Sequence, residues 1–459
     1  MILNQTLPQG KTFFALVGLS AGYALHATRF LLACLLNGPR LSCAEAAGTV
    51  RTAPCHRSTL TRFLRHLPAV LRDDWLEAVF GSLLTAEPPK GTWLLILDQT
   101  YCGHNSARLD NGYSTSPRGK RTPKDKKDKK DKRNKRKKQP QSYCHCFVCG
   151  LVITPTGLRL PLWRPYYTQD YCARSGRPFL KQTELAAQLI QQLRVPKGAD
   201  VVVLGDTAFD ANALLATCAR RHFTFVVAMN GDRVLADDRR QTKVTDLADR
   251  WTAQDYTPVR LTPGKGRYEA QRRAAACRVG LTRKSRTFWV HHEDLWVHNV
   301  GTARVLYSTM QEPVAGQAVQ PQKVLLSNDT RRSVAALVEL YDLRWQIELF
   351  FKELKSILGL ARYRLSDFHC VEGWVSLCLL AFAYLEWYRA EQLGQPGQSA
   401  KEQSRWRWQR SFGLSVAVRQ EIEREDLLAL AERLQAPDGV TEVQALLRRA
   451  VQKEYRIGA

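Results

Sequence analysis

The sequence predicts an α/β fold, with a mixed central sheet flanked by helices, and two observations lead to this prediction. Short continuous apolar runs between polar residues, such as "WLLIL" and "VVVLG", are typical of strands buried on both faces. Segments with helical periodicity, such as "TELAAQLIQQLR" and "ANALLATCARR", stand between such runs. Strands that alternate with helices in this way favour one sheet covered by helices.

Five regions follow one another along the chain. Residues 1–90 are expected to be helical, and residues 91–230 hold the first part of the α/β core. Residues 231–325 contain repeated strand-like pieces and predict a β-rich insertion into this core. Residues 326–390 complete the core with two helices, and residues 391–459 form a polar, largely helical tail that is a candidate for dimerisation.

The N-terminal region contains three short amphipathic pieces, "HATRFLLACLL", "CAEAAGTV" and "RSTLTRFLRHL". The last of them is expected to begin at a Ser/Thr N-cap. Such a group of helices is interpreted either as a small DNA-binding module or as a plain helical subdomain, and the sequence leaves both interpretations open.

Each strand of the core has its own signal. "GTWLLILDQTY" predicts a strand that ends at Asp98, and "ADVVVLGDTAFD" predicts one that ends at Asp206. "CHCFVCGLVITPTG" and "LRLPLWRPYY" predict a hairpin around the Thr-Pro-Thr-Gly turn, and "HFTFVVAMN" predicts a further strand. In the insertion, "RTFWVHHEDLWVHNV", "ARVLYST" and "QKVLLSN" are strand-like. A helix is then expected after the Asn/Asp/Thr cap of "SNDT".

Charge and hydropathy indicate the class of partner. The formal net charge of +25 predicts a polyanionic partner, most simply nucleic acid, although an anionic membrane surface or ribosomal RNA would explain the charge equally well. The apolar stretch at residues 375–385 is followed by Glu386 and is too short to span a bilayer. No convincing signal peptide is present, so we expect a cytoplasmic protein that does not bind a membrane.

A basic run at residues 118–138 contains fourteen Lys or Arg and three Asp residues. Such a block cannot bury enough apolar surface to fold, so we expect a disordered, solvated loop over residues 118–140. It is interpreted either as a tolerated surface insertion or as a loop that contacts phosphates without sequence preference. In both cases it lies close in sequence to Asp98.

Twelve cysteines are scattered along the chain, which is poor evidence for a disulfide framework. The cluster Cys144, His145, Cys146 and Cys149 suggests zinc, but its spacing lacks the usual pairs of zinc ligands. The same segment continues as an apolar strand, on which Cys144 and Cys146 would share a face and Cys149 would lie on the other. We therefore favour buried strand cysteines over a zinc site.

The segment "YDLRWQIELFFKELK" predicts a helix with two different faces. The apolar face consists of Leu343, Ile347, Phe350, Phe351, Leu354, Ile357 and Leu358. The opposite face consists of Tyr341, Arg344, Trp345, Glu348, Lys352 and Lys355. One interpretation is a packed helix with ordinary i,i+4 ion pairs from Glu348 to Arg344 and Lys352. The other makes Glu348 part of a site with residues elsewhere in the chain.

Asp98 and Asp206 are candidates for that site, because strand ends direct side chains into the crevice of an α/β sheet. Three converging carboxylates would hold two divalent cations, and their hard oxygen ligands select Mg²⁺ or Mn²⁺. Such a pair of ions hydrolyses phosphodiesters by activating water and stabilising the leaving oxygen. However, aspartates at strand ends are also common as loop starts or helix caps, and spacing alone does not establish convergence.

These motifs together resemble those of bacterial insertion-sequence transposases of the DDE class, the IS-four family. Tyr341, Arg344, Glu348 and Lys355 match the family signature Tyr-x2-Arg-x3-Glu-x6-Lys at every position. "DTAFD", which begins at Asp206, is similar to the second-aspartate motif, and "LILDQT" to the first-aspartate strand. The resemblance covers roughly residues 90 to 390. The basic run at 118–138 is a departure that removes no catalytic residue.

The resemblance implies an RNase H-like catalytic core in which Asp98, Asp206 and Glu348 are catalytic metal ligands. It further implies that Tyr341, Arg344 and Lys355 bind DNA phosphates near the cleaved end. Because they share the face of Glu348, Lys352 and Trp345 are added as DNA contacts, through a phosphate and by stacking on a base. Trp345 is equally explained by packing at the edge of the core. In such enzymes the β-rich insertion helps to hold the DNA end.

The function expected from this resemblance is cut-and-paste DNA transposition with Mg²⁺ or Mn²⁺. Double-stranded DNA is the partner, as terminal inverted repeats and as target, and a homodimer on paired ends is expected. Three alternatives remain: an RNase H-like nuclease without strand transfer, a catalytically inactive DNA-binding descendant of a transposase, and a zinc-dependent binding module.

Overall fold

The computed structural model describes most of the chain. The described residues are 7–37, 41–50, 55–71, 75–84, 91–104, 109–115, 142–235, 241–262, 285–317, 319–393, 395–408 and 411–452. The basic run at 118–138, and the disordered loop expected over 118–140, therefore lie outside the described residues.

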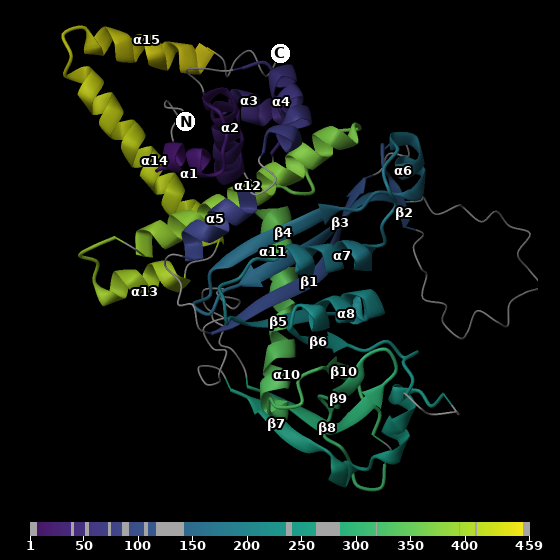
Figure 1. Ribbon diagram of the computed structural model, residues 1–459. Helices are drawn as coiled ribbons and strands as arrows, with labels where there is room; N and C mark the ends of the chain where they lie inside the picture. The colour runs from purple at the N-terminus through teal and green to yellow at the C-terminus, as the bar shows by residue number, and fades with distance from the viewer. Residues whose placement is uncertain are drawn as a thin grey trace, which may run out of the picture.

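A mixed sheet of ten strands crosses the described part of the molecule (Figure 1). The strands are β1 Thr92–His104, β2 Tyr113–Thr115, β3 Ser142–Ile153, β4 Arg159–Pro165, β5 Asp200–Gly205, β6 Thr224–Ala228, β7 Thr257–Leu261, β8 Arg286–Val297, β9 Gly301–Thr309 and β10 Lys323–Ser327. Their order is β2-β3-β1-β5-β6-β10-β9-β8-β7, and β4 pairs with β3 beside β2. The pairs β1–β5 and β5–β6 are parallel, whereas the other pairs are antiparallel. The expected α/β class and the expected β3–β4 hairpin are both confirmed.

Strand β1 does not end at Asp98, as the sequence suggested. It continues to His104, because the residues from Asp98 onward pair with β3, beginning with Asp98 opposite Cys149. Its parallel pairing with β5 stops at Ile96 opposite Leu204. Asp98 therefore lies just beyond the point where β1 and β5 separate, at the end of the sheet where Asp206 follows β5.

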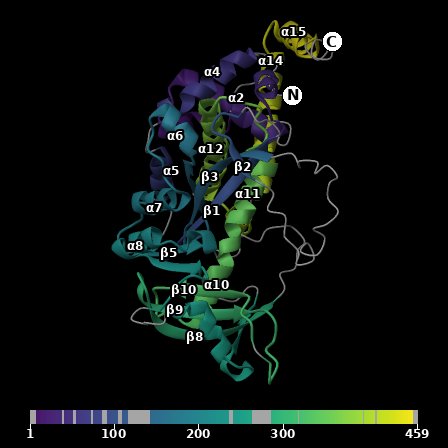
Figure 2. The same ribbon diagram turned by 90° about the vertical axis from the view of Figure 1, so that its right-hand side faces the viewer.

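Helices cover both faces of the first half of the sheet (Figure 2). One face carries α7 (Gln182–Gln192) and α8 (Asn212–Arg220), which pack against each other and on β1, β3, β4 and β6. The other face carries α11 (Gln346–Ser356), which packs on β1 and β3, and α12 (Phe368–Leu393), which packs on β4. The short helix α6 (Gln169–Ser175) follows β4.

The strands expected between residues 231 and 325 extend the same sheet beyond β6. β10 pairs antiparallel with β6, with Leu326 opposite Val227, and β9, β8 and β7 follow in turn. The second half of the sheet is therefore joined to the first by main-chain hydrogen bonds. It also supplies one wall of the site described below.

The helix around Glu348 is divided into two. α10 (Val334–Asp342) begins at Ser333, whose side chain accepts from the Ala336 N–H, so the cap lies a little after the Asn/Asp/Thr run expected to provide it. A 3₁₀ turn, η6 (Leu343–Trp345), then leads into α11. The predicted apolar face is confirmed, because Leu343, Ile347, Phe350, Phe351, Leu354 and Leu358 are buried.

The N-terminal helices pack around α12 at one end of the molecule (Figure 1). They are α1 Gly10–Leu16, α2 Ala21–Asn37, α3 Cys43–Gly48, α4 Arg57–Val70 and α5 Trp75–Leu84. α4 begins after His56, whose ring accepts from the Ser58 N–H, and not at a Ser/Thr cap. α4 and α12 touch at Gly373, where a Cβ atom would lie 1.9 Å from the Leu64 carbonyl oxygen, so only glycine allows this approach.

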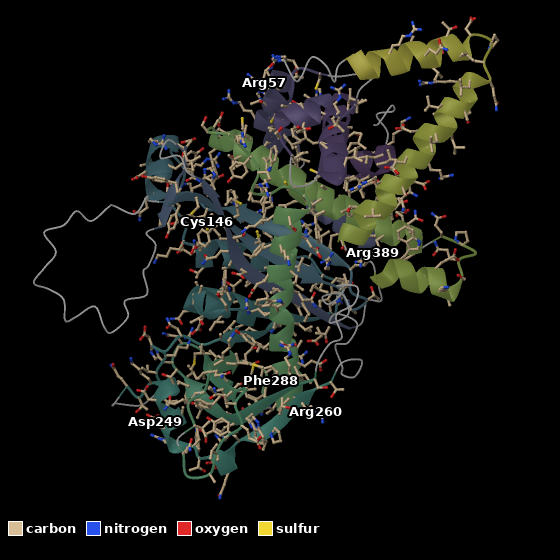
Figure 3. All side chains as sticks on the ribbon, turned by 180° about the vertical axis from the view of Figure 1, so that it is seen from behind. Arg57, Cys146, Asp249, Arg260, Phe288 and Arg389 are labelled. Atoms are coloured by element: carbon tan, nitrogen blue, oxygen red, sulfur yellow. The ribbon has the colours of Figure 1, made fainter. Side chains whose placement is uncertain are left out.

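Helix α12 is buried along most of its length and carries charged residues into the core. Arg159 of β4 donates to Glu386 of α12 through its backbone N–H and its guanidinium group, over distances of 3.0 to 3.2 Å. Arg159 also reaches Glu353 of α11 at 3.0 Å, and Arg389 pairs with Glu386. Figure 3 shows Arg389 close to the end of α12. This four-residue cluster joins the sheet to α11 and α12.

Among the described helices, α12 is long and apolar enough to cross a membrane, but 94% of its most apolar window is buried inside the protein. Such burial is typical of a core helix.

Three helices form the C-terminal region: α13 (Ala400–Trp408), α14 (Ser411–Leu434) and α15 (Gly439–Gln452). Figure 1 shows α14 and α15 extending away from the sheet. Leu427 and Leu428 of α14 are exposed. The role of this region in dimerisation remains a prediction.

Candidate active site

Three carboxylates expected to act together come from three different elements. Asp98 lies within β1, Asp206 follows β5, and Glu348 lies in the first turn of α11. The side chain of Asp98 is only 16% exposed, whereas that of Glu348 is 34% exposed. Asp206 and Glu348 lie near enough to Asp98 for their negative charges to act on it.

Arg344 links two of these carboxylates. Its guanidinium group donates to Glu348 at 2.7 Å and lies 3.7 Å from Asp98. The i,i+4 pair with Glu348 is therefore present, as the local interpretation of the helix required. Because Arg344 also reaches β1, the pair is part of a contact between the helix and the sheet.

Asp206 has a structural role as well. Its side chain accepts from the Ala208 N–H at 2.9 Å and so caps the 3₁₀ helix η3 (Thr207–Phe209). Gly205 precedes it, and a Cβ atom there would lie 2.9 Å from the Cβ of Phe209. The tight turn that ends β5 therefore fixes the backbone from which Asp206 leaves the sheet.

Burial raises the pKa of Asp98 to about 6, and the charges of Asp206 and Glu348 act in the same direction. The Gln99 N–H, which donates to Asp98 at 2.7 Å, and the Arg344 guanidinium group oppose this shift. A carboxyl group that resists ionisation beside two other carboxylates is a common feature of functional sites.

The three carboxylates supply the hard oxygen ligands that Mg²⁺ and Mn²⁺ prefer. In the described part of the chain, however, no group of three or more His, Cys, Asp or Glu side chains closes around a common point that could hold a metal ion. Arg344 bridges Asp98 and Glu348 instead. The chemistry of the donor atoms thus fits such ions.

The other residues of the predicted DNA-binding face come from α10, η6 and α11. The ammonium group of Lys355 donates to the Tyr101 carbonyl oxygen of β1 at 3.1 Å. Tyr341 is half-buried, and burial raises the pKa of its hydroxyl group. Lys352 is exposed, and Trp345 is 57% exposed, so packing at the edge of the core does not account for most of the Trp345 surface.

One cation near the site, Lys323, was not predicted from the sequence. The ammonium group of Lys323, on β10, lies 3.4 Å from the Tyr341 hydroxyl group and 5.1 Å from the centre of its ring. The charges of Asp206 and Glu348 also act on it. A single lysine at the start of a strand carries no sequence signal of such a role, because its position depends on the pairing of β10 with β6.

The cysteine cluster forms part of β3, as expected. Cys144, Cys146 and Cys149 are buried, and Figure 3 shows Cys146 within the sheet region. Burial raises the pKa of Cys146 to about 12, so this thiol stays protonated and is a poor metal ligand. Both ring nitrogens of His145 are hydrogen-bonded at 2.8 Å, to the Tyr363 hydroxyl group and to the Asp110 carbonyl oxygen. These contacts explain the cluster as part of the core.

The raised pKa of Asp98 predicts a pH-dependent stability. Between about pH 4, where an unfolded Asp ionises, and pH 6, the folded protein holds one proton more. Ionisation of Asp98 therefore lowers the free energy of unfolding as the pH rises through this window, by up to about 3 kcal/mol. Urea unfolding of the wild type and of Asp98→Asn without metal should show the variant gaining relative stability from pH 4 to pH 6. A constant difference across this range would contradict the prediction.

Comparison with known proteins identifies a family for the chain. A family model described as transposase DDE domain matches residues 114–384, which is more than half of the chain. The matched segment contains Asp206, Glu348 and the α11 cations, whereas Asp98 lies before it. A search of curated proteins found no match. The chain therefore belongs to the family of transposases with a DDE domain.

Proposed function

We propose that the protein cleaves DNA at the ends of an insertion sequence and joins those ends to target DNA, by cut-and-paste transposition. The observation that carries this proposal is the arrangement of Asp98, Asp206 and Glu348 at one end of the sheet, with Arg344 between two of them. The family match supports transposition, and the Tyr341 to Lys355 spacing supports assignment to the IS-four family.

An RNase H-like core is supported by the first half of the sheet. β4, β3 and β1 are antiparallel neighbours, and β1, β5 and β6 are parallel neighbours, with helices on both faces. This is a mixed sheet of the kind that the sequence resemblance implies. The carboxylates come from the two central strands and from a helix that packs on β1.

In the proposed reaction, Asp98, Asp206 and Glu348 would hold two Mg²⁺ or Mn²⁺ ions. Such ions supply activation of the attacking water and stabilisation of the leaving oxygen. Arg344, which lies beside Asp98 and Glu348, would bind a phosphate when these carboxylates hold the ions. Tyr341, Lys352 and Lys355 bind the DNA backbone on the same face, and the exposed ring of Trp345 stacks on a base.

The assembly follows from the same proposal. Two ends of the element must be held together, so we expect a homodimer on double-stranded DNA, in the cytoplasm where the nucleoid lies. The net charge of +25 favours binding to the DNA backbone. The exposed apolar residues of α14 make the C-terminal region a candidate for contact between the two copies.

The test uses a DNA fragment that spans the end of the element, taken from the sequence flanking the gene. With Mg²⁺, the full chain should nick this fragment at the element boundary and, when target DNA is added, form joined products. A fragment with a scrambled end and a reaction with EDTA serve as controls. Nicking without joining would favour a nuclease, and binding without cleavage would favour an inactive DNA-binding descendant.

A further inference from the structure

A cavity of about 240 Å³ lies beside the carboxylates, between the second half of the sheet and the helix that leads to Glu348. β8, β9 and β10 form one wall, and α10 and η6 form the other. Phe288, labelled on β8 in Figure 3, and Val338 of α10 give it an apolar part. Three cations, Arg286, Lys323 and Arg344, also line it.

Two of the three cations already have carboxylate partners. Arg286 pairs with Asp342 at 2.6 Å, and Arg344 pairs with Glu348 and approaches Asp98. Lys323 differs, because no carboxylate in the described part of the chain lies within ion-pair distance of its ammonium group. This ammonium group contacts the hydroxyl group and the ring of Tyr341, which carry no charge.

A bound anion would stabilise the positive charge of Lys323. Partial desolvation and the positive charge of Arg344 lower the pKa of Lys323, whereas Asp206 and Glu348 act in the opposite direction. If those carboxylates held metal ions, their negative charges would stabilise the Lys323 ammonium group less. Lys323, Arg344 and the Tyr341 hydroxyl group line the same cavity, in which the one carboxylate among the described lining residues, Asp342, is paired with Arg286.

A phosphate group suits this arrangement, because its oxygens accept charge-assisted hydrogen bonds from ammonium, guanidinium and hydroxyl groups together. We propose that Lys323 is a DNA-binding residue that holds a backbone phosphate in this cavity together with Arg344 and Tyr341. The proposal rests on the proposed function, and it adds a contact from β10, outside the Tyr341 to Lys355 segment. It also gives the second half of the sheet a direct part in binding DNA.

The test measures binding of the full chain to the element-end fragment at several salt concentrations, for the wild type, Lys323→Gln and Lys323→Arg. A lysine that contacts a phosphate adds about one unit to the slope of log affinity against log salt. Lys323→Gln should therefore bind several-fold more weakly with a slope reduced by about one unit, and Lys323→Arg should keep the wild-type slope. Melting temperatures of the variants establish that they are folded.

The matched control is Lys197→Gln, which removes one exposed lysine before β5, at the opposite end of that strand from Asp206. It should bind and nick as the wild type does. Unchanged affinity and slope in Lys323→Gln, with a wild type that nicks the fragment, would overturn the proposed contact alone. A wild type that neither binds nor nicks the fragment would overturn the proposed function as well.

A role of Lys323 limited to supporting Tyr341 gives a different result. Lys323→Gln, which removes the ammonium group from the Tyr341 ring, would then change the rate of nicking while leaving the salt dependence of binding at its wild-type value. That outcome would also overturn the phosphate contact.

Discussion

Glu348→Gln is expected to slow metal-dependent nicking severely and to leave DNA binding intact. Gln keeps the size of the side chain and an oxygen that accepts from Arg344, but it removes the negative charge required to hold a divalent ion. Loss of several kcal/mol of transition-state stabilisation corresponds to a fall of roughly a thousandfold in rate. The rate should be measured on the element-end fragment with Mg²⁺, and binding should be measured on the same fragment.

The matched control for this variant is Glu432→Gln, which makes the same change on the exposed surface of α14. It should nick at the wild-type rate. If Glu348→Gln nicked as fast as Glu432→Gln, Glu348 would only be a partner of Arg344 in an ordinary helix pair. Loss of binding as well as nicking would indicate that the substitution had disturbed α11.

The largest effect on stability is expected from Arg159→Met. Arg159 is buried and holds Glu386 and Glu353 together, and the Glu386 side chain is 0% exposed. Removing the guanidinium group leaves Glu386 with Arg389 and deprives Glu353 of this ion pair. Breaking a buried ion cluster in this way costs about 3–5 kcal/mol, because a buried charge is left uncompensated. Urea unfolding at neutral pH measures this loss.

Arg164→Met provides the comparison, because Arg164 lies on the same strand and is half-buried, beside Gln192 of α7. Its loss should cost no more than about 1 kcal/mol, as expected for a hydrogen bond near the surface. Equal losses in the two variants would show that the buried cluster contributes no more than a surface contact does. Arg159→Met should also disturb the position of α11, because Glu353 lies on the same helix as Glu348.

Much of the site could be predicted because it depends on local periodicity. The spacing of Ile347, Phe350 and Leu354 required one face of α11 to be buried, and this placed Glu348 and Lys352 on the other. The continuous apolar runs of β1 and β5 also located the central residues of these strands, because both faces of the sheet are covered there. The 3₁₀ turn at η6 has no such signal, because the sequence there fits a continuous helix equally well.

The remainder depends on contacts between distant parts of the chain. β1 continues past Asp98 because β3 offers hydrogen-bond partners as far as Tyr143, and the residues of that extension have no apolar pattern of their own. Lys323 reaches Tyr341 only because β10 returns to pair with β6. In neither case does the surrounding sequence predict the contact.

The packing of the N-terminal helices on α12 has a consequence for synthesis on the ribosome. Phe30 of α2 lies against Trp374, and Arg65 of α4 pairs with Asp367, 302 residues later in the chain. These first helices emerge long before the helix that covers their apolar surfaces. Until α12 is complete they must remain exposed or protected by a chaperone, and chains that stop before residue 368 should tend to aggregate.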